Sequence, residues 1–154
     1  MYLVARLSED GIRICYSLNV ENSKPNEWKK YFDDGDSYLK TATKGRQNQT
    51  KFNPIMIYNI TTMAIEKFFM AFFLYNHKMP TNHTMQDLAD SIKEIIPMES
   101  SLYADLVRLD TYLDICSLGA FNAKALTNTE LDFGLAVALR TKSFIEKQLP
   151  AAVE

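Results

Sequence analysis

Apolar residues recur along most of the chain at the three-to-four-residue spacing of an amphipathic α-helix. In the segment that follows Ser100 the intervals are four, three, four and three positions, at Leu102, Leu106, Leu109, Leu113 and Cys116. This spacing aligns the side chains in one stripe that can pack against other helices. The pattern therefore predicts a helix that begins at Ser100 or Ser101.

Capping residues and prolines mark the boundaries of four further helices. Asn53-Pro54 combines a capping side chain with a proline in the first turn, and Pro25 can also occupy a first turn. Thr84 and the stretch 127–130 supply further caps. The predicted helices cover residues 25–42, 54–77, 85–96 and a last segment that carries Leu131, Leu135, Ala138, Ile145 and Leu149.

The N-terminal residues 2–20 have a different pattern. Tyr2–Leu7 and Ile12–Leu18 are rich in β-branched and aromatic residues, and Asp10-Gly11 between them favours a tight turn. We interpret these residues as a short β-hairpin, with a helix over residues 2–7 as the competing interpretation.

Length and composition agree with one helical domain. The chain has 154 residues, of which 47% are apolar, and this is enough for a real core. Five glycines and five prolines are few for a β-sandwich or barrel. We therefore predict an all-α fold: an up-down antiparallel bundle of about five helices in residues 21–154, preceded by the hairpin extension in residues 1–20.

The segment 55–75 is apolar around nearly its whole circumference, which predicts deep burial. A membrane span is the alternative, but Glu66 and Lys67 lie at its middle, where each charge would cost about 2.5–3.5 kcal/mol. We expect a central bundle helix and no membrane contact. Glu66 and Lys67 are adjacent and cannot face one another, so we expect them to form structural ion pairs with other helices.

Charge and cysteine content narrow the function classes. The formal net charge is −2, which does not indicate general nucleic-acid binding. Cys15 and Cys116 form no metal-binding motif and suit a reducing compartment. A single disulfide between them is the alternative. The N-terminus lacks the pattern of a signal peptide. We therefore expect a cytoplasmic protein with no metal and no cofactor.

One helix resembles a known family. The run Met63-Ala-Ile-Glu66-Lys67-Phe-Phe-Met-Ala71-Phe-Phe-Leu74 is similar to the core helix of HEPN domains, where an alanine and a Glu-Lys pair precede apolar residues. Met85-Gln-Asp-Leu88 resembles the start of that family's next helix, and Asn26-Glu-Trp28 suits its first helix. The resemblance covers roughly residues 25–149.

The resemblance implies a helical bundle that is usually dimeric and that acts on RNA or pairs with a nucleotidyltransferase-like partner. Nuclease members carry an arginine, four to six residues and then a histidine late in the chain. This sequence lacks that motif, because its only histidines are His77 and His83. We therefore predict no catalytic residue and do not transfer the RNA-cleaving activity.

The remaining polar candidates have ordinary interpretations. His77 and His83 lack a second ligand at metal-binding spacing, and we expect them at a helix end and its loop. Asp110 and Asp114 share a helix face and could hold a divalent metal, but a solvated acidic face is the favoured interpretation.

A basic segment is the main candidate site. Residues 37–65 contain Lys40, Lys44, Arg46 and Lys51 and no acidic residue. The polar residues 41–51 look like a solvated loop, and these four cations could contact phosphates without sequence preference. Replacing all four with alanine should abolish RNA binding and leave the thermal midpoint almost unchanged.

Together these features predict a non-catalytic HEPN-like binding or interaction module. We expect a homodimer, because the helices offer more apolar surface than one small bundle hides. RNA, nucleotide phosphates or a nucleotidyltransferase-like protein are the expected partners. The alternatives are a divergent HEPN ribonuclease that depends on His77 or His83, or a structural subunit of a protein complex.

Overall fold

The computed structural model describes residues 26–112 and 126–150, which form five α-helices. Their bounds are α1 Glu27–Gln47, α2 Pro54–Tyr75, α3 Met85–Lys93, α4 Ser100–Asp110 and α5 Asn128–Glu146. The described part contains no strand. The prediction of an all-α bundle of about five helices is therefore confirmed.

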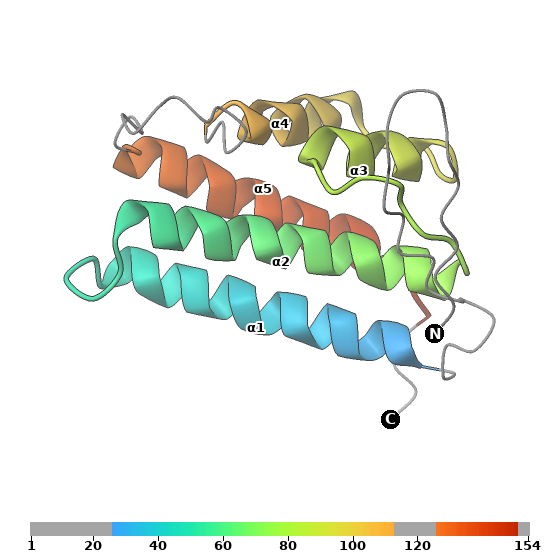
Figure 1. The fold of residues 1–154 in the computed structure, drawn as a ribbon, viewed down its shortest axis with the longest axis horizontal. Coiled ribbons are helices and arrows are strands. Elements are labelled where there is room, and N and C mark those ends of the chain that lie inside the picture. The colour runs from blue at the N-terminus through green and yellow to red at the C-terminus, as the bar shows by residue number, and fades with distance from the viewer. Residues whose placement is uncertain (1–25, 113–125, 151–154) are drawn as a thin grey trace, which may run out of the picture.

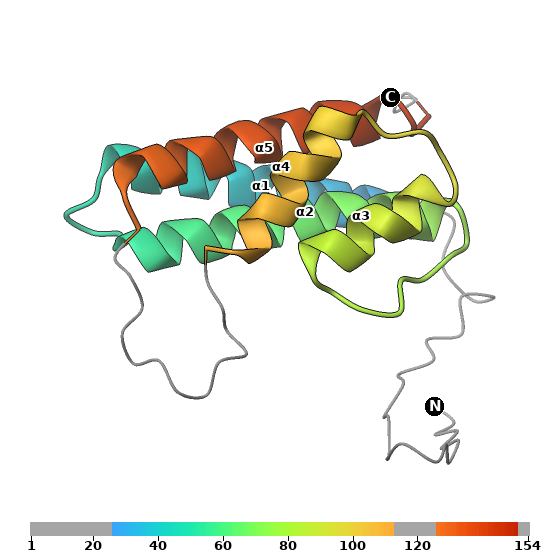
Figure 2. The same ribbon diagram turned by 90° about the horizontal axis from the view of Figure 1, so that it is seen from above.

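Three long helices and two short ones make up the bundle. The long helices α1, α2 and α5 lie side by side, and α1 and α2 run in opposite directions (Figure 1). The short helices α3 and α4 pack against each other and cover the other side of α2 and α5 (Figure 2). Because α3 and α4 return the chain, α5 runs beside α2 in the same direction.

The core is built around α2. Phe68, Phe69, Phe72 and Phe73 from its C-terminal half are at most 1% exposed. Leucines and isoleucines of α3, α4 and α5 close around them, and all are at most 3% exposed: Leu88, Ile92, Leu102, Leu106, Leu109, Leu131 and Ile145. Helix α2 is therefore enclosed by protein over this half, as the sequence predicts, and the apolar spacing of α4 is confirmed at its three described leucines.

The predicted helix starts are confirmed by their caps. The Asn53 side chain accepts a hydrogen bond from the Met56 N–H at 2.7 Å, and Thr84 accepts one from Asp87 N–H at 3.1 Å. Thr127 and Glu130 form a reciprocal capping box at the start of α5. These contacts join residues three positions apart, so the sequence alone is enough to predict them.

Two helix ends differ from the prediction. Residues 43–47, beyond the predicted end of the first helix, belong to α1, because Ala42 and Gly45 continue the buried face of Gly35 and Leu39. Helix α3 ends at Lys93 rather than at Ile96, before Pro97 is reached. Packing lengthens α1 in spite of its polar sequence.

Several expectations lie outside the described residues. The hairpin extension assigned to residues 1–20 is one, and the boundary between it and the domain 21–154 is another. Leu113, Asp114 and Cys116 also fall outside.

Candidate functional site

The four cations of the basic segment divide into two pairs. Lys40 Nζ lies 2.6 Å from an Asp36 carboxylate oxygen, one turn earlier on α1. Arg46 donates two hydrogen bonds to Asp132 of α5, at 2.7 and 3.0 Å. These two cations therefore have carboxylate partners within the bundle, and Arg46 connects α1 to α5.

Lys44 and Lys51 have no such partner among the described residues. Both are exposed, at the end of α1 and in the turn before α2. The residues between them include the amides Gln47, Asn48 and Gln49. Gln49 donates a hydrogen bond to Asn128 at 2.7 Å. Of the four cations of the basic segment, Lys44 and Lys51 are therefore the two without an ion pair to any residue that the structure describes.

The Glu66–Lys67 pair is divided between two neighbours. Glu66 Oε1 lies 2.9 Å from His83 Nδ1, which is in the loop before α3. Lys67 Nζ lies 4.5 Å from the centre of the Tyr31 ring, so its neighbour on α1 is an aromatic face and not a carboxylate. Each residue contacts a different part of the chain, because adjacent helical positions point in different directions.

The other polar candidates have structural contacts. Both carboxylate oxygens of Asp110 accept hydrogen bonds from backbone N–H groups at the start of α3, from Met85 at 3.1 Å and Gln86 at 2.9 Å. Asp110 therefore caps α3 from the end of α4, a role that a sequence separation of 24 or 25 residues conceals. Among the described residues, no three His, Cys, Asp or Glu side chains could hold a metal ion.

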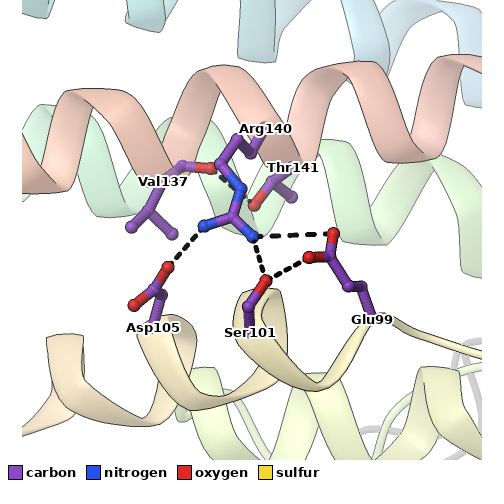
Figure 3. Close-up of polar contacts among 6 residues, drawn as sticks. All are labelled: Glu99, Ser101, Asp105, Val137, Arg140 and Thr141. Carbon is purple, nitrogen blue, oxygen red and sulfur yellow. Dashed lines mark hydrogen bonds and ion pairs between the residues drawn. The ribbon is translucent and has the colours of Figure 1, made fainter.

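Arg140 organises a polar cluster between α4 and α5 (Figure 3). Its guanidinium donates hydrogen bonds to Asp105 and to Ser101 Oγ, the second at 2.6 Å, and lies 3.7 Å from Glu99. Ser101 donates in turn to Glu99. The fifth, sixth and seventh residues after Arg140, where the nuclease motif would place histidine, are Ile145, Glu146 and Lys147. Arg140 therefore serves as an interhelical clamp.

One side of α2 is apolar and uncovered. Ile55, Met56 and Met63 are 40, 44 and 41% exposed, and exposed Asn59 lies between them. We call these four residues the outer face of α2. The expectation that the whole helix is deeply buried is therefore wrong for this side of its N-terminal half, which no described helix covers. On the other side of the same half, Ile57, Thr61 and Ala64 are at most 2% exposed.

Helix α2 is also the one described helix that is long and apolar enough to cross a membrane. In its most apolar 18-residue window, 61% is buried inside the bundle. Length and composition alone do not distinguish such a helix from a core helix.

Two solved structures resemble this fold. TT1696 from Thermus thermophilus has a TM-score of 0.68 and 17% identity, over 81% of this chain and 100% of that one. ST0689, described as an archaeal HEPN homologue, has a TM-score of 0.64 and 11% identity, over 80% of this chain and 98% of that one. No protein-family model and no curated protein matches the sequence.

Proposed function

We propose that this chain, whose fold is HEPN-like, is a non-catalytic interaction module that binds a second copy of itself through the outer face of α2. The exposure of Ile55, Met56 and Met63 carries the proposal. Apolar side chains gathered on one helix face are typical of surfaces that bind another protein. Methionine suits such a surface because its side chain is flexible and polarisable.

The outer face has opposite charges at its two ends, Lys51 and Glu66, so it can be electrostatically complementary to a second copy. No charged residue occurs between Lys51 and Glu66, so the apolar segment has a cation before it and an anion after it. In a symmetric dimer the same patch serves both chains. If two α2 helices pack antiparallel with Met56 opposite the partner's Met63, Asn53 at the start of α2 lies opposite the partner's Glu66. Lys51 is in the turn just before Asn53 and is therefore at the same edge of the dimer. A second copy would therefore cover the apolar face and bring Lys51 toward Glu66, which within its own chain contacts His83.

The first test measures the mass of the chain in solution. We expect the parent to sediment as a dimer and the variant Met56→Gln/Met63→Gln to have a dissociation constant at least about tenfold higher. Leu139→Gln is the matched control, because Leu139 is 55% exposed on α5 and lies outside the outer face. A monomeric parent, or a double variant as dimeric as the control, would contradict self-association through α2.

The second test uses exchanged charges. Lys51→Glu places two like charges at each edge of the proposed dimer, and so does Glu66→Lys, so each variant alone should be monomeric. An equimolar mixture should form a heterodimer, because both edges then regain opposite charges. Dimers formed by the single variants, or no association in the mixture, would rule out this arrangement even if the parent is dimeric.

Phosphate binding is a second candidate function, favoured by the two unpaired lysines. Lys44 and Lys51 are exposed at one end of the bundle, where they could contact the backbone of a single-stranded RNA. The four-alanine variant is no longer a clean test, since it would also remove the Lys40–Asp36 and Arg46–Asp132 pairs.

Binding of a labelled oligouridylate at several salt concentrations tests this candidate. Lys44→Ala/Lys51→Ala should lower the salt dependence by about 1.4 in logarithmic slope. Lys30→Ala/Lys78→Ala, two exposed lysines at the opposite end of α1 and α2, should leave it unchanged. Equal losses from both variants, or no binding by the parent at low salt, would exclude a phosphate site at this end. Intact RNA after the assay agrees with a non-catalytic role.

A further inference from the structure

A cavity of about 440 Å³ lies where α1 begins and α5 ends. Trp28 and Phe32 of α1 supply its aromatic walls, and Leu149 and Pro150, just after α5, supply aliphatic surface. Its volume is in the range of small-molecule sites, which are mostly apolar with a few polar groups. None of its lining residues belongs to α2, so the cavity is separate from the outer face.

The two aromatic walls are held in place by rings from α2. Trp28 packs edge-on against Tyr75, with ring centres 5.8 Å apart. Phe32 packs against the fully buried Phe68 at 5.2 Å. A ligand that enters the cavity would therefore meet surfaces that are already ordered, which reduces the entropy cost of binding.

The polar lining of the cavity favours a cation. It consists of Asp33, Glu146 and Lys29, so that two carboxylates stand against one ammonium group. Neither carboxylate has a hydrogen-bonded cation among the residues that the structure describes. Lys29 Nζ lies 5.7 Å from the centre of the Trp28 ring, so this ring can interact with a cation, and a bound cation would replace the flexible lysine there.

We propose that this cavity binds an organic cation with an apolar body. The ammonium group would lie near the carboxylates of Asp33 and Glu146, which outnumber the one lysine of the lining. The apolar body would pack on the Trp28 and Phe32 rings and on Leu149. An aromatic ring also attracts a cation through its negatively charged face, so the walls and the carboxylates select the same ligand class.

Trp28 provides a direct measurement, because it is the only tryptophan in the chain. The experiment titrates the full chain with benzyltrimethylammonium, benzyl alcohol and benzoate, and follows tryptophan fluorescence. These three probes share an aromatic ring and are cationic, neutral and anionic. We expect a saturable change for the cation with a dissociation constant below about 1 mM, and at least tenfold weaker binding of the other two.

Two variants test the role of the carboxylates. Asp33→Asn/Glu146→Gln should raise the dissociation constant of the cation at least about tenfold. Asp34→Asn/Glu94→Gln, which removes two carboxylates outside the cavity lining, should not change it. Both pairs remove the same number of charges, so a general effect of net charge would appear in both. None of the four side chains is buried, so we expect all variants to fold, and unchanged helical content by circular dichroism checks this.

Three results would overturn the proposal. Equal binding of benzyl alcohol or benzoate would show that the site does not select charge. Equal weakening by the two double variants would show that the carboxylates of the cavity are not responsible. No saturable signal with any probe would show that the cavity is closed to small ligands, for example because another part of the chain fills it.

Discussion

His77 holds a backbone conformation that most side chains avoid. Its φ is 53°, in the left-handed region, directly after the cap of α2. Its N–H donates to Leu74 O at 3.1 Å, and the Lys78 N–H donates to Phe73 O at 2.8 Å. This is the hydrogen-bond pattern of a Schellman motif, in which glycine is the usual residue at the left-handed position. The histidine is therefore strained where it ends the helix.

We expect His77→Gly to raise the free energy of unfolding by about 1 kcal/mol, because glycine adopts a positive φ without a steric penalty. Urea unfolding followed by circular dichroism measures the change. His77→Ala is the control: it removes the imidazole but keeps a Cβ, and should give no gain. If alanine stabilises as much as glycine, the side chain and not the backbone is the cause.

The close packing of α1 on α2 depends on Gly35. A Cβ at this position would lie 2.8 Å from Phe68 Cε1 and 3.2 Å from the Ala64 carbonyl oxygen. A glycine in the middle of a helix usually costs about 1 kcal/mol relative to alanine. In the bundle this glycine is what allows the two helices to approach. Gly134 on α5 differs, since a Cβ there would lie 3.7 Å from the nearest side-chain atom, an ordinary contact.

Substituting alanine at these two glycines should change the stability in opposite directions. Gly35→Ala should destabilise the protein by about 1–3 kcal/mol, because the fully buried Phe68 ring cannot move aside. Gly134→Ala should stabilise it by up to about 1 kcal/mol, because alanine favours a helix and fits the space. Thermal midpoints of both variants measure the difference. A gain in stability from Gly35→Ala would mean that α1 and α2 do not pack as described.

At the scale of the whole molecule, polar contacts join helices that are distant in the sequence. Asp36 of α1 is hydrogen-bonded by Lys142 of α5 as well as by Lys40. The hydrogen bonds from Lys142 and then from Lys40 lower the pKa of Asp36 below its usual value of 3.8. Asp36 is therefore a charged link between the first and last helices.

This link predicts a contribution to stability that depends on pH. Because the pKa of Asp36 is lower in the folded state, the unfolded chain takes up its proton first as the pH falls. The contribution is present above about pH 4, the usual range of an aspartate, and is lost as the pH falls further through the folded pKa. Asp36→Asn should lower the free energy of unfolding at pH 7. It should also make this free energy fall less steeply as the pH is lowered below about 4. Asp34→Asn on the same helix should keep the slope of the parent, and an equal slope in both variants would contradict the link.

The sequence predicted local features well. The caps at Asn53, Thr84 and Thr127 are set by residues three positions away, and the apolar spacing of α4 marks its buried side. It predicted the basic segment as four equivalent cations, but two of them form ion pairs with Asp36 and Asp132. One of these partners lies 86 positions from Arg46, a separation that no local pattern reveals.

By itself, the sequence determined that this chain forms helices, where four of them begin and that α2 belongs to the core, because spacing and capping act within a few residues. The tertiary structure decided which side of α2 the other described helices leave uncovered, which lysines have no ion pair within the described residues, and where a cavity forms. These properties depend on which surfaces meet when the helices pack, and the meeting surfaces come from positions far apart in the chain.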